Sequence, residues 1–240
     1  MRYNRDVLRL ALAFLLAWLP SVARADSRPT SDDASLRSGR TLGNGELLVA
    51  VTAGWPGVEG EVLFSPSSRF DVGPRLSLLY ASPFLGFATG LGGELSLPMR
   101  LHLYGKRDVD VALAARPLFV IGDGALVGQE GIFADDRGFG VGAEVGARVG
   151  LHLGDAFTLG LGASATLAYV STPDADAAGG GGGSDGIVGV VTAQVLAEAL
   201  LSRSTLLLAD LRAGGGGHTG DGLFSSRAHL QLALGVAYRP

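Results

Sequence analysis

Residues Phe139 to Leu153 read FGVGAEVGARVGLHL, and their side chains alternate between two chemical classes with a period of two. Successive residues of a β-strand point to opposite faces, so this segment has one apolar face and one polar, glycine-spaced face. The polar face carries Glu144, Arg148 and His152, whereas the apolar face carries only Phe, Val, Ala and Leu. About 9 to 11 tilted strand residues cross a bilayer, and this segment is longer. The stretch therefore predicts a membrane-spanning β-strand.

The same alternation recurs along the chain. Counted in this way, the expected strands are Glu46–Trp55, Val58–Phe64, Phe70–Tyr80, Gly93–Tyr104, Val109–Ile121, Phe139–Leu153, Phe157–Tyr169, Val188–Ala199, Thr205–Ala213 and His229–Tyr238. In each of them, the face that carries every long aliphatic side chain carries no formal charge. The charges of the other face are too sparse for a solvated exterior and suit a narrow lumen. The sequence predicts an all-β fold: a closed antiparallel up-and-down transmembrane β-barrel of about ten strands, with eight to twelve possible.

The connections between these strands fall into two kinds that alternate along the chain. The short ones are Ser65–Arg69, Gly105–Asp108, Gly154–Ala156 and Leu200–Ser204, and the long ones are Ala81–Gly92, Gly122–Gly138, Ser171–Ile187 and Gly214–Ala228. Outer-membrane barrels have short periplasmic turns and long extracellular loops, so this asymmetry supports the barrel. Only Pro56-Gly57 departs from it, as a tight turn where a long loop is expected.

The first residues are typical of an export signal. Three arginines precede an apolar run from Leu10 to Leu19, and Ala23-Arg24-Ala25 offers the small-x-small pattern that signal peptidase cuts. The run is too short for the alternative, a retained anchor helix. We expect a signal peptide over residues 1–25 cleaved after Ala25, a disordered periplasmic lead-in over 26–45, and the barrel over 46–240.

Composition agrees with a membrane barrel and excludes several classes. Charged residues make up 18% of the chain, fewer than in most soluble domains, and the mean hydropathy is +0.33. Loss of four Arg and one Asp with the signal peptide moves the formal charge from −4 to about −7, which argues against a nucleic-acid partner. With 0 Cys there is no disulfide framework and no lipidation site. No cofactor and no metal is expected, because the acidic pairs near Asp135 and Asp174 lack the spacing of a calcium loop.

The chain ends in HLQLALGVAYRP, in which Leu230, Leu232, Leu234, Val236 and Tyr238 alternate with smaller or polar residues. This end resembles the C-terminal strand of bacterial outer-membrane proteins, although Arg239 and Pro240 follow the aromatic residue here. With the signal sequence and the loop asymmetry, the chain resembles small outer-membrane β-barrels of the OmpA/OmpX and OmpW type. The resemblance implies the outer membrane of a Gram-negative bacterium. It also implies two partners, outer-membrane lipid and the barrel-assembly machinery, the latter through the last strand.

Ionisable residues of both signs fall on the predicted lumen face. Besides Glu59, Glu61 and Arg75, the predicted lumen charge network comprises Glu94, Arg100, His102, Asp110, Arg116, Glu144, Arg148, His152, Glu198, Asp210 and Arg212. Charges in a narrow interior must be paired or hydrated, because isolation from water costs several kcal/mol each. We favour a structural ion-pair network that plugs or narrows the lumen. The alternative is a water-filled pore whose charges set a weak preference for ions or solutes.

Histidine next to carboxylate or hydroxyl is the only hint of catalysis. The register places His102 beside Asp110, with His152 at the same level and Thr158 close, while Ser225, Ser226 and His229 cluster elsewhere. No catalytic residues are assigned, since no histidine lies on an apolar face. The expected function is a non-enzymatic outer-membrane barrel, structural or a narrow passive channel for small polar solutes or ions. A lipid-modifying outer-membrane hydrolase and a soluble periplasmic lipocalin-like binder stay open as alternatives.

Overall fold

The computed structural model describes residues 39–85, 91–106, 108–123, 137–154, 156–171, 185–220 and 223–240. The expected signal peptide lies outside the described residues, as does the lead-in up to residue 38. The strands are β1 (Leu47–Trp55), β2 (Gly57–Ser67), β3 (Phe70–Val72), β4 (Arg75–Leu79), β5 (Gly92–Ser96), β6 (Met99–Lys106), β7 (Val109–Asp123), β8 (Arg137–His152), β9 (Phe157–Ser171), β10 (Asp185–Ser202), β11 (Thr205–Gly220) and β12 (Leu223–Tyr238). In this described part of the chain, no helix is long and apolar enough to span a membrane.

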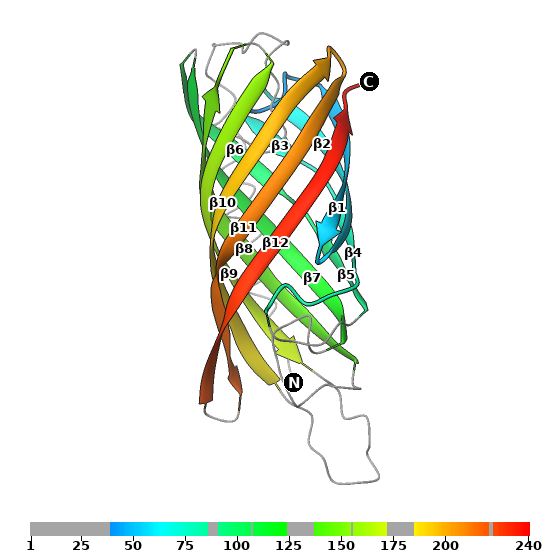
Figure 1. The fold of residues 1–240 in the computed structure, drawn as a ribbon, viewed down its shortest axis with the longest axis vertical. Coiled ribbons are helices and arrows are strands. Elements are labelled where there is room, and N and C mark those ends of the chain that lie inside the picture. Colours follow the sequence, from blue (N-terminus) through cyan, green and yellow to red (C-terminus); the bar gives the residue numbers. More distant parts are fainter. Residues whose placement is uncertain are drawn as a thin grey trace, which may run out of the picture.

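The strands form a closed antiparallel barrel of ten strands, so the predicted fold class is confirmed (Figure 1). From β7 to β12 each strand pairs with the next, β1 pairs with β2, and β12 returns to pair with β1 from Val49↔Tyr238 to Trp55↔Leu232. The two additional strands arise because two expected strands are each divided in two. β3 and β4 both pair with β2, and β5 and β6 both pair with β7.

Proline accounts for both divisions. Pro74 separates β3 from β4 and Pro98 separates β5 from β6, and proline has no N–H to give to a ladder. Their carbonyls still accept hydrogen bonds across the gap, from Val62 N to Pro74 O (3.0 Å) and from Gly73 N to Pro98 O (3.2 Å). The barrel wall is therefore continuous at these points.

The apolar faces lie outside, as the alternation predicts. Leu97, Val145 and Leu232 are 41%, 58% and 50% exposed, whereas Glu144 and Asp110 are 6% and 0% exposed. The structure describes all ten expected strand segments, and no charged residue within them is exposed. An exterior of this composition is suited to acyl chains rather than to water.

The interior, however, is more apolar than the sequence analysis expects. Two clusters of buried aliphatic and aromatic side chains lie inside, one near the short turns and one near the long loops. The first contains Leu42, Leu48, Ala50, Leu63, Leu206, Leu208 and Ala237, and the second Phe84, Val170 and Val188. The expectation that one face carries every long aliphatic side chain is thus wrong. Alternation assigns a side chain to a face, but it does not prevent leucines from packing together inside.

The strand after the long glycine run is also longer than expected. Residues 214–217 belong to β11, which pairs with β12 as far as Gly220↔Leu223, so most of the expected loop Gly214–Ala228 is a β-hairpin. Glycine lowers strand propensity, which is why the sequence suggests a loop. At Gly216 the structure shows why a side chain is absent: a Cβ would lie 2.8 Å from Val190 Cγ2 and 3.0 Å from Phe84 Cε1.

The barrel wall is shortest at the β1–β2 hairpin. Pro56 alone links the two strands, as the sequence predicts, and β1 ends well short of the lower tips of β11 and β12 in Figure 1. The segment that follows β4 covers the edge of β12 that extends beyond this hairpin. Leu85 N donates to Ala228 O (2.8 Å), and Leu230 N donates to Pro83 O (2.9 Å). These two hydrogen bonds flank Phe84, whose side chain lies in the lumen.

Candidate functional site: the charged interior of the barrel

Glu144 on β8 is the centre of the main charge network. It lies directly opposite Arg116 of β7 in the strand register, and Arg116 Nη2 donates to Glu144 Oε2 at 2.6 Å. The other terminal nitrogen of Arg116 donates to Glu94 on β5. One guanidinium thus holds two carboxylates from different strands, a use that suits its planar fork of donors.

A second guanidinium reaches the same carboxylate from the far side of the lumen. Arg212 Nη1 on β11 lies 3.5 Å from Glu144 Oε2, and Arg212 Nε lies 3.4 Å from Asp210 Oδ2. Gln194 Nε2 on β10 extends this series of contacts, because it donates to both oxygens of Asp210 at 2.8 Å. Because β9 and β10 separate β8 from β11 in the wall, the Glu144–Arg212 contact crosses the interior of the barrel.

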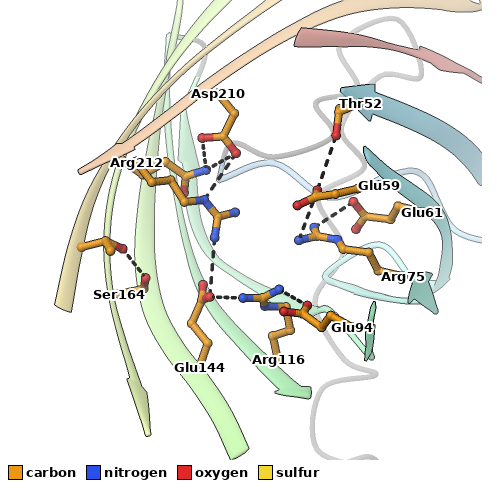
Figure 2. Close-up of polar contacts among 12 residues, drawn as sticks. Thr52, Glu59, Glu61, Arg75, Glu94, Arg116, Glu144, Ser164, Asp210 and Arg212 are labelled. Carbon is orange, nitrogen blue, oxygen red and sulfur yellow. Dashed lines mark hydrogen bonds and ion pairs between the residues drawn. The ribbon is translucent and has the colours of Figure 1, made fainter. Parts of the chain in front are cut away.

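A separate group faces this network from β1, β2 and β4. Arg75 Nη2 donates to Glu61 Oε2 at 2.8 Å, and Arg75 Nη1 lies 3.9 Å from Glu59 Oε2. Thr52 Oγ1 donates to Glu59 at 3.4 Å. Figure 2 shows the two groups pointing toward the barrel axis from opposite walls. The register explains the group, since Glu61 and Arg75 are paired residues of β2 and β4.

Two further carboxylates lie nearer the short turns, and both are fully buried. Asp71 on β3 accepts from Arg100 on β6, with Nε at 3.0 Å, and also from the backbone N–H of Leu42 at 3.1 Å. Asp110 on β7 contacts His152 Nε2. These two carboxylates hold the strand wall and the segment before β1 together.

The histidine partner of Asp110 differs from the expected one. His152 Nδ1 lies 2.9 Å from Thr158 Oγ1, so His152 bridges a hydroxyl and a carboxylate. His102 Nδ1 instead lies 2.9 Å from Gly39 O. A β-bulge between His102 and Tyr104 shifts the register of β6 against β7, and the simple alternation count could not foresee it.

The segment before β1 enters the mouth of the barrel at the short-turn end. Leu42 is 0% exposed and joins the apolar cluster there, and Ser65 Oγ donates to Leu42 O at 3.1 Å. Thr41 Oγ1 donates to Ser68 O at 2.8 Å, and Arg40 Nε lies 3.7 Å from Asp110 Oδ2. Residues 39–42 thus differ from the expected disorder, because their side chains and backbone have partners that only the closed barrel supplies. We call residues 39–42 the plug.

The half of the lumen nearer the long loops holds a cavity of about 130 Å³, which we call the chamber. Its charged lining residues are Glu59, Glu94, Arg116, Glu144, Asp210 and Arg212, and toward the long loops its wall becomes apolar with Phe84, Leu118, Val120, Val170, Val188 and Val190. Phe84 packs edge-on against the ring of His229, with centroids 5.3 Å apart. The chamber is therefore apolar at its end nearer the long loops and charged at its other end.

The structure thus places the predicted lumen residues inside, but in several groups rather than in one. Arg148 is partly buried beside the main network, and Glu198 is buried on β10. Sequence reasoning missed Asp71, Gln194, Leu42 and Phe84. Asp71 falls on the same strand face as Arg75, and Gln194 falls on the same face as Glu198. The alternation of the sequence therefore also places Asp71 and Gln194 in the lumen. Leu42 and Phe84 lie outside the expected strands, and no local pattern indicates where they pack.

The residues considered for lipid chemistry do not form a described catalytic site. His229 is 8% exposed and faces the lumen rather than the lipid. The side chains of Ser225 and Ser226 lie outside the described residues. Among residues that the structure describes, no group of three or more His, Cys, Asp or Glu could hold a metal ion.

No protein-family model and no curated protein sequence matches this chain. The solved structures to which this chain is similar include two bacterial proteins. The outer membrane protease OmpT from Escherichia coli has a TM-score of 0.43 and 8% identity, over 82% of this chain and 94% of that one. The beta domain of the Bordetella autotransporter BrkA has a TM-score of 0.41 and 14% identity, over 81% and 98%.

Proposed function

We propose that this chain is a non-enzymatic outer-membrane barrel with a closed interior, serving the structure of the envelope rather than open passage of solutes. The exterior of the barrel supports the membrane location. The plug carries the proposal of closure. Lipid around the barrel and the assembly machinery acting on β12 are the partners that this function requires.

The plug supports closure because a hydrophobic side chain seals the mouth. Leu42 packs among Leu48, Leu63, Leu206 and Leu208, and the Asp71 carboxylate accepts a hydrogen bond from its backbone N–H. Behind this seal, the Glu144–Arg212 contact crosses the lumen. An ion that passed would have to separate buried charge pairs, and breaking such a pair costs about 3–5 kcal/mol.

Single-channel recording in planar bilayers tests this proposal. The full chain is expected to give no regular conductance steps, whereas Leu42→Gly combined with Thr41→Gly should produce small steps by loosening the plug. Leu47→Ala, on the outer face of β1, is the control and should stay silent. Regular steps from the unaltered chain would overturn closure.

A narrow channel is the second candidate, and the chamber is the observation in its favour. The volume of the chamber, about 130 Å³, equals that of roughly four molecules of liquid water, so this half of the lumen has room for water. A channel requires the plug to leave the short-turn mouth. The same recording therefore decides between the two candidates.

A further inference from the structure

One side of the barrel presents small residues to the membrane. On the outer face of β10, Val191 is 64% exposed and projects from a hollow of about 760 Å³. Ala165 on β9 and Gly215 on β11 are its cross-strand partners, and Gly189 and Ala193 are its neighbours on the same face of β10. Val191 is thus a single protruding side chain with four small residues around it.

The packing of the chain itself explains two glycines of β11 but not Gly215. A Cβ at Gly214 would lie 1.9 Å from the backbone of β10, and a Cβ at Gly216 would lie 2.7 Å from Gly189 O. The atom nearest to a Cβ at Gly215 is Arg227 O at 3.7 Å, and a Cβ at Gly189 would have no atom of the described residues within 4 Å. Glycine weakens a strand, and it often marks a point where another backbone approaches closely. Gly189 and Gly215 therefore indicate a close approach from outside the barrel.

Gly215 and Ala193 form a line of small residues parallel to the barrel axis. Strands of such barrels tilt by about 40°, and in Figure 1 they lean from the β10 side toward the β12 side as they approach the short turns. Ala193 lies one strand back from Gly215 and two residues nearer the short turns. Because neighbouring strands are about 4.8 Å apart and two residues span about 6.8 Å, the two sideways displacements nearly cancel. Val191 lies beside this line, at a height between its two members.

This shape is self-complementary, which indicates a second copy of the chain as the partner. Two copies inserted in the same direction are related by a two-fold axis along the membrane normal. With that axis between Val191 and the line, Val191 of each copy enters the space between Gly215 and Ala193 of the other. In a bilayer, apolar area alone does not drive association, whereas close packing at small residues does. An acyl chain would cover the small residues but would leave Val191 without a matching recess.

We propose that the outer face of β10 and β11 is the interface of a homodimer, in which Val191 of each copy packs between Gly215 and Ala193 of the other copy. The contact is isologous, so the same surface serves both copies. Val145, two strands away on β8, remains in contact with lipid. This inference goes beyond the proposed envelope role, and it does not depend on closure of the lumen.

Förster transfer between labelled copies of the full chain in lipid vesicles tests the proposal. The chain contains 0 Cys, so Arg203→Cys, in the exposed turn between β10 and β11, can carry one donor or one acceptor dye. Mixed donor and acceptor copies are expected to show transfer that persists when the vesicles are diluted about tenfold with lipid. Transfer that falls to the level of random collisions, as it would if lipid alone covers this face, would overturn the proposal.

Two matched glycine variants locate the contact. Gly215→Leu fills the space that Val191 of the other copy enters, so it should lower the transfer about fivefold at the same lipid ratio. Gly60→Leu adds the same side chain to the outer face of β2, four strands away from β10, and should leave the transfer unchanged. The fold tolerates both changes, since a Cβ at Gly60 would have no atom of the described residues within 4 Å. Equal transfer by the two variants would contradict the assignment of the interface to β10 and β11.

Discussion

At the scale of single residues, the interior depends on side chains that each serve several strands. Glu144 accepts from Arg116 and lies within ion-pair distance of Arg212, so three strands meet at one carboxylate. Gly216 acts in the opposite way, because the absence of its side chain leaves space for Phe84. At both residues, the effect of a substitution on stability can be compared with that of a matched substitution at a control position.

Neutralising Glu144 should destabilise the barrel strongly. Glu144→Gln leaves Arg116 and Arg212 buried with fewer counter-charges, which we expect to cost about 3–5 kcal/mol. Urea unfolding in detergent micelles measures this change. The control is Glu46→Gln at the rim. Glu46 lies 3.9 Å from Arg239, and a glutamine there can still accept the 3.0 Å hydrogen bond from Gly43 N, so the change should cost under about 1 kcal/mol. Similar losses for the two variants would show that the network does not hold the strands.

Adding a side chain at Gly216 should displace Phe84. Gly216→Val places a Cβ 2.7 Å from Gly189 O, 2.8 Å from Val190 Cγ2 and 3.0 Å from Phe84 Cε1, and overpacking of this kind costs about 1–3 kcal/mol. Gly215→Val faces outward, where the nearest atom to a Cβ is Arg227 O at 3.7 Å, and should be tolerated. The two variants are compared by their midpoints of thermal unfolding, which are read from the difference in gel mobility between the folded and the unfolded protein. Equal midpoints would contradict the close packing of Gly189, Val190 and Phe84 around Gly216.

At the scale of elements, the alternation predicted each strand because lipid on one side and a narrow lumen on the other impose a strict period of two. It failed where other forces act. Pro74 and Pro98 divide two strands, a β-bulge shifts His102 relative to Asp110, and a glycine run extends β11 where strand propensity is low. The strand count was thus predictable, whereas the partner of each charged residue depended on bulges and on loop segments.

A charge on the outer face should be costly at mid-strand. Val145→Arg places a guanidinium among acyl chains, with a cost of about 2–4 kcal/mol near the bilayer midplane. Val145→Leu keeps the face apolar and should be nearly neutral. The free energy of reversible folding into lipid vesicles is the quantity to measure for both variants. Arginine and leucine variants of equal stability would indicate that this face is exposed to water.

At the scale of the whole molecule, the chain is a barrel whose inside is filled from both ends. Leu42 packs inside the short-turn mouth, Phe84 enters from the long-loop side, and an ion pair crosses the lumen between them. Sequence alone predicted the cylinder and the polarity of its wall, and it favoured an ion-pair network over a pore. It could not predict the plug, because Gly39 meets His102 across a separation of 63 residues that no local periodicity encodes.

Spin-label accessibility in liposomes tests whether the apolar side chains of the barrel wall face the lipid. The chain contains 0 Cys, so single substitutions to cysteine at Leu97, Val145 and Leu232 can each carry one nitroxide. We predict that all three labels collide readily with oxygen dissolved in the bilayer and rarely with a water-soluble nickel chelate. Ready collision with the nickel chelate would show that these side chains face water, and protection from both reagents would show that they face a protein core; either result would rule out a lipid-facing apolar wall.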